Sequence, residues 1–324
     1  MSLKDPDEEQ IEFDRRIAEI AELQHSLVTL SNVVAVGGTH RHATTRLVSG
    51  RWERCGVSVY RIAGTPATYE SRVLASILSA GDGAVASHRC AARLLGVGFP
   101  TAPPEISIPR GRFHRPEGAL VHTSTDLDRC RVVKPHGIPT TDAARTLLDL
   151  GRYIGPQALG RAVELGRRLE LVAWSDLAAC LATHARPGRH GVRRLRAVIA
   201  FGAANDEITD TDSELLALSL LREHGFGEPV LQHRVYDEEG RLLAEMDLAY
   251  LEHLVDFEVD GSVHLRPDVR ANDEARDHDM RQRGWTVRRI WWEIPVRHPD
   301  EFVRIVHQTL KEAADKSRAR NALL

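Results

Sequence analysis

The chain has 324 residues, enough for two or three domains, and its 42% hydrophobic and 27% charged residues are ordinary for a globular protein. No run approaches the roughly 18 consecutive apolar residues of a membrane-spanning helix, and the acidic N-terminal segment is unlike a signal peptide. The four dispersed cysteines lack C-x-x-C spacing, which disfavours a zinc ribbon or a disulfide framework. We therefore expect a cytoplasmic protein with no membrane partner; association with the nucleoid is left open.

The net charge of −3 conceals an uneven distribution. Residues 40–134 contain 14 Lys and Arg against 7 Asp and Glu, whereas residues 206–324 contain 16 against 26. A basic region can bind phosphates by releasing counterions. An acidic region concentrates the carboxylates that hard divalent cations prefer. The alternative is that both regions are solvated surfaces without a ligand.

The first 75 residues predict three short helices followed by a hairpin. The helices are expected over 11–28, 29–36 and 39–49, the second capped by Thr29 or Ser31, and the strands over 51–54 and 57–62. This order is typical of a winged helix-turn-helix, whose helix after the turn lies in the DNA major groove. The alternative is a helical packing module with exposed arginines. The side chains expected to contact double-stranded DNA are Arg41, His42, Thr45, Arg46, Arg51 and Arg54.

Residues 76–205 are expected to be mainly helical, interrupted by extended pieces at 105–109 and 119–124. The region contains no Ser-His-Asp arrangement, no phosphate-binding glycine loop and no H-E-x-x-H motif. His88 follows Ser87 at a helix start and is interpreted as a capping or core residue. The region is therefore expected to be scaffold, with a linker between about 202 and 212.

Two C-terminal segments, 245–250 and 256–260, alternate polar and apolar residues at the period of half-buried strands. With a tight turn centred on Glu252 and His253, Asp247 lies opposite Glu258, and Glu245 lies opposite Asp260. Opposed side chains in such a pair have Cβ atoms about 4.5–5.5 Å apart, so these carboxylates repel unless they are well solvated or share a cation. The hairpin therefore predicts a site for Mg²⁺ or Mn²⁺.

Residues 206–324 predict elements in the order α-β-β-β-α-β-α, and here the sequence resembles the Vsr-like (very-short-patch-repair endonuclease-like) branch of the PD-(D/E)XK nuclease superfamily. The matching positions are Glu214, Gln232, Asp247, residues 257–261 with His264, and Asp279 and Arg281 before the strand that starts near 284. Residues 15–150 resemble AbiEi-type antitoxins. That resemblance rests on the winged-helix stretch 23–60 and the segments 87–92 and 137–149.

These resemblances imply an α+β protein with a winged helix over 1–75, a mainly helical middle over 76–205 and a restriction-endonuclease-like αβββαβα domain over 206–324. The implied activity is metal-dependent hydrolysis of phosphodiester bonds in DNA, with Asp247, Glu258 and Glu214 as ligands of Mg²⁺ or Mn²⁺. Where the superfamily has a lysine, this chain has Asp260, and His264 is the expected general base or acid. Gln232 is expected to contact substrate or water, and Arg281 a phosphate or Asp260.

The competing interpretation is a non-catalytic AbiEi-like antitoxin or repressor that keeps an inactive nuclease fold. A third, a nuclease toxin or phage-defence effector with a cognate partner, shares the chemistry of the first. The sequence leaves open DNA against RNA, the cleavage sequence and whether the protein forms a homodimer.

Overall fold

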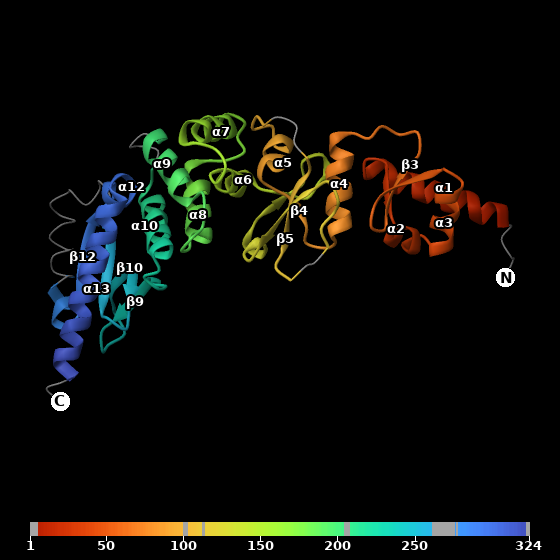
Figure 1. Ribbon diagram of the computed structural model, residues 1–324. Helices are drawn as coiled ribbons and strands as arrows, with labels where there is room; N and C mark the ends of the chain where they lie inside the picture. The colour runs from red at the N-terminus through yellow and green to blue at the C-terminus, as the bar shows by residue number, and fades with distance from the viewer. Residues whose placement is uncertain are drawn as a thin grey trace. The chain divides into compact units, whose positions relative to one another are not determined.

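The computed structural model describes residues 6–99, 103–111, 114–203, 208–260, 276 and 278–321. These residues form a mixed α+β structure that divides into two compact units, residues 1–150 and 151–324, each described by itself below (Figure 1). The expected domain boundaries near 75 and 205 stay predictions. Among the described helices, none has both the length and the apolar character that crossing a membrane requires.

The first unit begins with three helices and a three-stranded sheet in the order β1-β3-β2, in which both pairs are antiparallel. Apolar residues of the first helix, including Phe13 and Ile17, pack against Trp52 and Tyr60 of the hairpin. The elements are α1 (Pro6–Leu23), β1 (Leu27–Thr29), α2 (Leu30–Ala35), α3 (His40–Val48), β2 (Trp52–Gly56) and β3 (Val59–Ile62).

The helix expected over 11–28 was placed five residues too far along the chain, because α1 spans Pro6–Leu23. His25 and Ser26 adopt left-handed backbone angles, with φ of 53° and 65°, and turn the chain into β1. Leu27 then pairs with Arg61 of β3, a partner that local sequence does not reveal. Thr29 caps α2 as expected, since its side chain accepts a hydrogen bond from the backbone of Asn32.

The rest of the first unit contains a five-stranded sheet in the order β6-β5-β4-β8-β7. The expected strands at 105–109 and 119–124 are present, and three further strands that were not expected complete the sheet; among the described elements of 76–205 as a whole, helices still outnumber strands. Three of its strands have only two residues, too few to display a period of two. The elements are α4 (Tyr69–Ala80), β4 (Val85–Ala86), α5 (His88–Leu94), β5 (Glu105–Pro109), β6 (Leu120–Ser124), β7 (Val132–Val133), β8 (Thr140–Thr141) and α6 (Ala143–Leu150), with short 3-10 turns at Leu127–Arg129 and Pro135–Gly137.

The second unit begins with helices that pack on the acidic C-terminal region. Within this unit α8 packs against α10, and α9 packs against α12. Thr209 caps α10 and forms a reciprocal capping box with Asp212. The helices are α7 (Pro156–Arg168), α8 (Trp174–His184), α9 (Val192–Gly202), α10 (Asp210–His224), α12 (Glu293–Arg297) and α13 (Pro299–Asn321).

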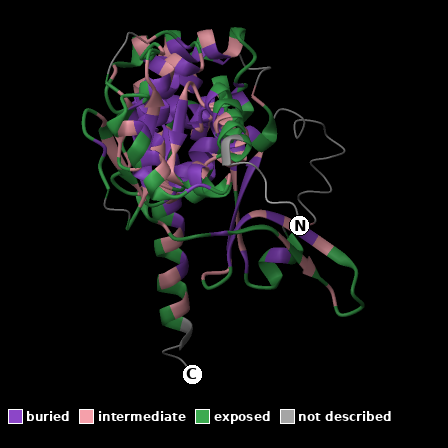
Figure 2. Cartoon of the chain, turned by 90° about the vertical axis from the view of Figure 1, so that its right-hand side faces the viewer, coloured by how far each residue is buried: buried purple, intermediate pink, exposed green. Residues whose placement is uncertain are grey.

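The sheet of the second unit has the order β12-β11-β10-β9, with β9, β10 and β11 antiparallel and β12 parallel to β11. Its apolar face packs on α10 and α13. Buried residues recur along α13 every three or four positions, at Phe302, Val306, Thr309 and Ala313, and Figure 2 shows the alternation of buried and exposed positions along this helix. The strands are β9 (Val230–Tyr236), β10 (Leu242–Tyr250), β11 (Val255–Asp260) and β12 (Thr286–Trp291).

Candidate active site

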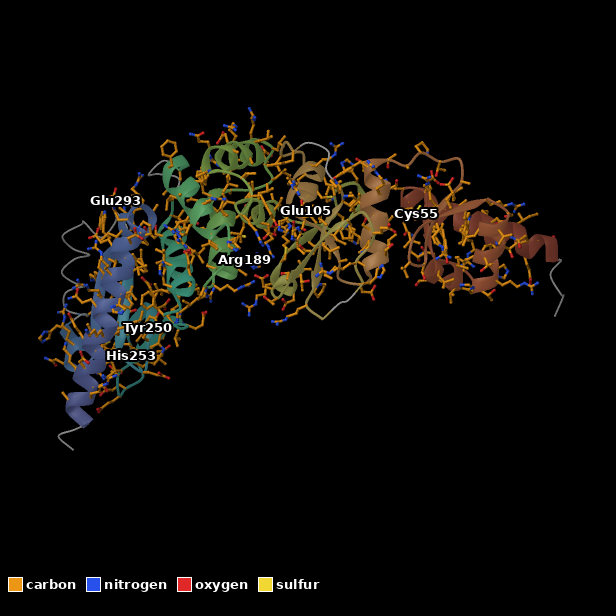
Figure 3. The ribbon with its side chains drawn as sticks, in the orientation of Figure 1. Cys55, Glu105, Arg189, Tyr250, His253 and Glu293 are labelled. Carbon is orange, nitrogen blue, oxygen red and sulfur yellow. The ribbon has the colours of Figure 1, made fainter. Side chains whose placement is uncertain are left out.

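The hairpin of β10 and β11 has the register expected from the sequence. Leu248 pairs with Phe257, and Tyr250 pairs with Val255 at the end of β10, where the chain turns through His253 (Figure 3). Continuing this ladder by one residue places Asp247 opposite Glu258. Because side chains alternate between the two faces of a strand, the carboxylates of β11 share the face opposite the apolar core.

Three residues from separate elements meet beside this hairpin. Nε2 of Gln232 on β9 lies 3.3 Å from Glu214 Oε2 on α10 and 3.2 Å from Asp247 Oδ1 on β10. The backbone amide of Val259 donates to Asp247 Oδ2 at 3.3 Å. Gln232 itself has φ of 50°, a left-handed angle that is costly for a residue with a side chain. The structure thus brings together Glu214, Gln232 and Asp247, three positions that the resemblance assigns to one site, and their roles toward metal and substrate stay predictions.

The charges of these carboxylates are mutually unfavourable. Partial burial, with repulsion from Asp247 and Asp210, raises the pKa of Glu214 to about 7. Burial also raises the pKa of Asp247, although the hydrogen bonds from Val259 and Gln232 oppose the shift. A cation bound here would relieve this repulsion.

Glu258 and Asp260 are held by arginines that the sequence analysis did not single out. Arg276 Nη2 lies 2.8 Å from both carboxylate oxygens of Glu258, and Arg289 lies 2.9 Å from Glu258 and 3.1 Å from Asp260. Glu258 and Arg289 are direct neighbours in the parallel ladder of β11 and β12. The two consecutive arginines in the strand after residue 284 were the available signal, but only the register identifies which one faces Glu258.

Asp256 was also missed, although it continues the alternation of the acidic face. Its side chain is fully buried, and within the described chain its Oδ2 has no hydrogen-bond partner. Its Oδ1 accepts a hydrogen bond of 3.3 Å from the amide of Leu248. Burial, with repulsion from Glu258 and Asp247, raises the pKa of Asp256 to about 8. We call Glu214, Asp247, Asp256, Glu258 and Asp260 the acidic cluster.

The residues fit a divalent cation in part. Glu214 and Asp247 offer oxygen ligands of the kind that Mg²⁺ and Mn²⁺ prefer. Glu258 faces two arginines and would have to leave them to join the same ion. Among the described residues, a group of three possible metal ligands lies elsewhere, in the first unit. It consists of His88, Glu105 and His122, whose ligand atoms lie within 4.8 Å of one another.

Two predicted site residues, His264 and Arg281, are not among the residues described above as contacting the acidic cluster. His264 lies outside the described residues. Arg281 is exposed, as is Asp279 on the same short helical stretch. The general base and the phosphate contact therefore stay predictions.

The expected DNA-contacting residues of the first unit separate into two groups. Arg46 is buried beneath the ring of Phe13 and bonds Asp14 at 2.5 Å, so the expectation that it faces DNA has to be corrected. His42 caps α3 through its Nδ1, which accepts the amide hydrogen of Thr39 at 3.0 Å. Those that remain exposed are Arg41, Thr45, Arg51 and Arg54.

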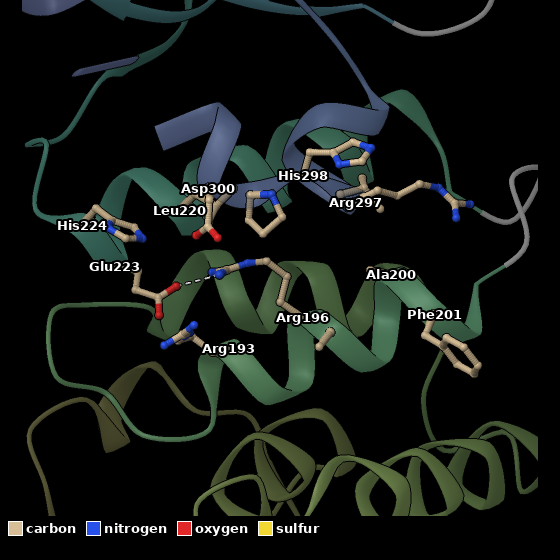
Figure 4. A pocket seen from close by; sticks show the side chains of 13 residues that line it. Arg193, Arg196, Ala200, Phe201, Leu220, Glu223, His224, Arg297, His298 and Asp300 are labelled. Carbon is tan, nitrogen blue, oxygen red and sulfur yellow. Dashed lines mark hydrogen bonds and ion pairs between the residues drawn. The ribbon is translucent and has the colours of Figure 1, made fainter. Parts of the chain in front are cut away.

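A pocket of about 630 Å³ lies apart from the acidic cluster, lined by residues of α9, α10, α12 and the start of α13 (Figure 4). Arg196 is buried in its wall and pairs with Glu223 at 2.6 Å. The lining also contains Arg193, Arg297 and Asp300, so positive and negative charges largely offset one another. None of the residues singled out from the sequence lines it.

Comparison with known proteins gives little likeness. No protein-family model matches the chain, and no curated protein matches it significantly. The solved structures that match include the crystal structure of RV2827C protein from Mycobacterium tuberculosis, which shares 14% sequence identity. The match covers 70% of this chain and 89% of the other, with a TM-score of 0.41. A likeness at that TM-score carries no argument about function.

Proposed function

We propose that this protein is a metal-dependent endonuclease, in which residues 206–324 form a Vsr-like PD-(D/E)XK domain and residues 1–75 a DNA-binding winged helix. One observation carries the proposal: Gln232 bridges the carboxylates of Glu214 and Asp247. These three residues lie on different elements, yet the resemblance assigned them to one site. The order of the described elements supports the same assignment: α10, β9, β10, β11, the helical residues 276 and 278–282, β12 and α13, with the short α12 added before α13.

In this proposal Glu214 and Asp247 hold Mg²⁺ or Mn²⁺, and Glu258 joins them by leaving its arginine partners. The bound ion would polarise a phosphoryl oxygen and lower the pKa of a bound water. Gln232 fixes the separation of the two carboxylates, and the Val259 amide fixes the orientation of Asp247. Arg276 and Arg289 supply positive charge beside the acidic face, where a phosphate can take the place of Glu258.

The test is cleavage of plasmid, linear duplex, single-stranded DNA and RNA in Mg²⁺, Mn²⁺ or EDTA. We expect cleavage that EDTA stops and that Asp247→Asn abolishes. Gln232→Ala should weaken metal affinity about 10- to 100-fold, since it removes a group that orients the ligands. The matched control is Glu252→Gln, which removes an exposed carboxylate in the hairpin turn. Cleavage that persists in the folded Asp247→Asn variant would contradict the proposal.

A second function, a DNA-binding regulator with a silent nuclease fold, is favoured by the ion pairs of Glu258. Two arginines already neutralise the carboxylate that a metal site would need. This candidate predicts duplex binding in EDTA without cleavage of any substrate. Replacing Arg41 and Arg54 with alanine should then weaken binding, and the slope of its salt dependence should fall by about 1 for each phosphate that the variant no longer neutralises. Arg15→Ala, on exposed α1, is the matched control.

A further inference from the structure

A second polar cluster lies in the first unit and shares no residue with the acidic cluster or with the expected DNA contacts. It consists of His88 at the start of α5, Glu105 at the start of β5 and His122 on β6, and we call it the histidine–glutamate cluster. Glu105 is only 1% exposed, and Figure 3 labels its position. Burying a carboxylate is costly unless partners compensate, so the fold has a specific arrangement around it.

The donor atoms of this cluster converge. One ligand atom from each of the three residues lies within 4.8 Å of the other two. His122 Nε2 is 2.8 Å from Glu105 Oε1, and the rings of His88 and His122 stack with centroids 3.8 Å apart. In a tetrahedral zinc site with bonds of about 2.0–2.1 Å, ligand atoms lie about 3.3 Å apart, so small side-chain shifts would suffice.

A second layer of contacts orients these side chains. Ser87 Oγ lies 2.9 Å from His88 Nδ1 and accepts a hydrogen bond from Ser107 Oγ at 2.9 Å. Both the backbone amide and Nε of Arg89 donate to Glu105 Oε2 at 3.1 Å. Such outer hydrogen bonds are typical of protein metal sites, where they fix the orientation of the ligands. His88 also has φ of 53°, a strained left-handed angle that is often found at functional positions.

We propose that His88, Glu105 and His122 bind one Zn²⁺ ion. Two imidazoles and one carboxylate are a ligand set that zinc uses when a fourth position is open to water or substrate. Nitrogen donors disfavour Mg²⁺, which distinguishes this site from the acidic cluster. The side chain of His122 is 25% exposed and gives the ion a route from solvent.

The test is zinc binding by the full-length protein after EDTA treatment and dialysis, followed by calorimetric titration and metal analysis. We expect about one zinc per chain in the wild type, and loss of that zinc in His122→Phe, which keeps a stacked ring without ligand nitrogens. Ser87→Ala should weaken binding about 10- to 100-fold, because Ser87 orients His88. His114→Ala, an exposed histidine of the same unit, should bind normally. Asp247→Asn should also bind normally, which separates this site from the proposed nuclease site.

X-ray absorption of the zinc-loaded wild type identifies the ligand atoms directly, and it does not depend on whether a variant folds. We expect two imidazole ligands and oxygen ligands at about 2.0 Å, without sulfur at about 2.3 Å. Sulfur scattering would indicate cysteine ligation and overturn the proposal. So would the absence of zinc binding by the folded wild type, or undiminished binding by His122→Phe. In each of those cases the cluster is a hydrogen-bonded network that holds no ion.

Discussion

The histidine–glutamate cluster and the acidic cluster shift the pKa of a glutamate in opposite directions. Burial alone would raise the pKa of Glu105, but hydrogen bonds from His122 and Arg89 outweigh it and lower the pKa to about 2. Burial and the nearby Asp247 raise the pKa of Glu214 to about 7. Both are glutamates with restricted access to water, so the difference comes from the charge of their neighbours.

The two clusters should therefore contribute differently to stability. Glu105 is compensated by Arg89 and His122, so its removal deprives both of the carboxylate that they contact. Asp247 repels both Glu214 and Asp256, which is the pattern of residues kept for function at a cost in stability. The predictions that follow are ordered from the largest expected effect to the smallest.

Glu105→Ala should lower the free energy of unfolding by about 1–3 kcal/mol, the usual cost of removing one partner from a buried hydrogen-bonded arrangement. The reason is that His122 and Arg89 lose the carboxylate that both contact. Chemical denaturation measures the change. Glu117→Ala removes an exposed glutamate of the same unit and should change stability by less than about 0.5 kcal/mol. Equal effects of the two substitutions would mean that Glu105 contributes no more to stability than an exposed glutamate.

The stabilities of the two units should depend on pH with opposite sign. Burial lowers the pKa of His88 from 6.5 to about 4, and the pKa of Glu105 falls from 4.5 to about 2. The unfolded chain binds more protons at these groups, so the first unit should lose stability as pH falls from about 6.5 to about 2.

In the second unit the pKa of Asp256 rises from 3.8 to about 8, and that of Glu214 from 4.5 to about 7. Here the folded chain binds more protons, so stability should fall as pH rises from about 4 to about 8. Hydrogen exchange of peptides from β5 and β11, corrected for intrinsic rates, can follow the two units separately. Protection from exchange that changes with pH in the same direction in both peptides would contradict the expected opposite signs.

Asp256→Asn should stabilise the second unit at about pH 8 by roughly 0.5–2 kcal/mol, the range usual for removing an unfavourable site. Asparagine keeps the oxygen that accepts from Leu248 but cannot ionise. The stabilisation should shrink toward pH 4, where the wild-type carboxyl is protonated when folded. Thermal unfolding at several pH values measures it, with Glu252→Gln as the control. A gain that does not vary with pH would exclude ionisation as the cause.

Gln232→Gly should be more stable than Gln232→Ala by up to about 1 kcal/mol, because only glycine adopts left-handed angles without a steric cost. Both variants lose the amide that joins Glu214 and Asp247, so their difference isolates the backbone strain at φ of 50°. Denaturation of the pair measures it. If the two variants are equally stable, the left-handed backbone angle at residue 232 carries no measurable strain.

Much of the acidic cluster could be predicted because its members are close in sequence or carry a recognisable pattern. The alternation in β10 and β11, with a short turn, leaves few registers, and the predicted one places Asp247 opposite Glu258. The contacts of Glu258 could not be predicted in this way. Arg289 faces it through a parallel pairing across an intervening segment, and Arg276 approaches from outside the sheet.

The histidine–glutamate cluster had no such signal. Its residues are 17 positions apart or more, and each alone is a common residue in an ordinary setting. His88 was interpreted as a capping or core residue, which is the natural inference from one histidine at a helix start. Only the arrangement of β5 beside β6, with α5 next to them, brings the two rings and the carboxylate together.

The sequence by itself determined most of the longer helices and strands, the hairpin register and the α+β class, because periodicity and turn residues act over a few neighbouring positions. The tertiary structure alone decided that Arg46 is buried, that Glu258 faces two arginines and that two distant histidines meet at Glu105. These outcomes depend on long-range pairing and on the desolvation of charges. Long-range pairing and desolvation both involve residues that are far apart in sequence and become neighbours only when the chain folds.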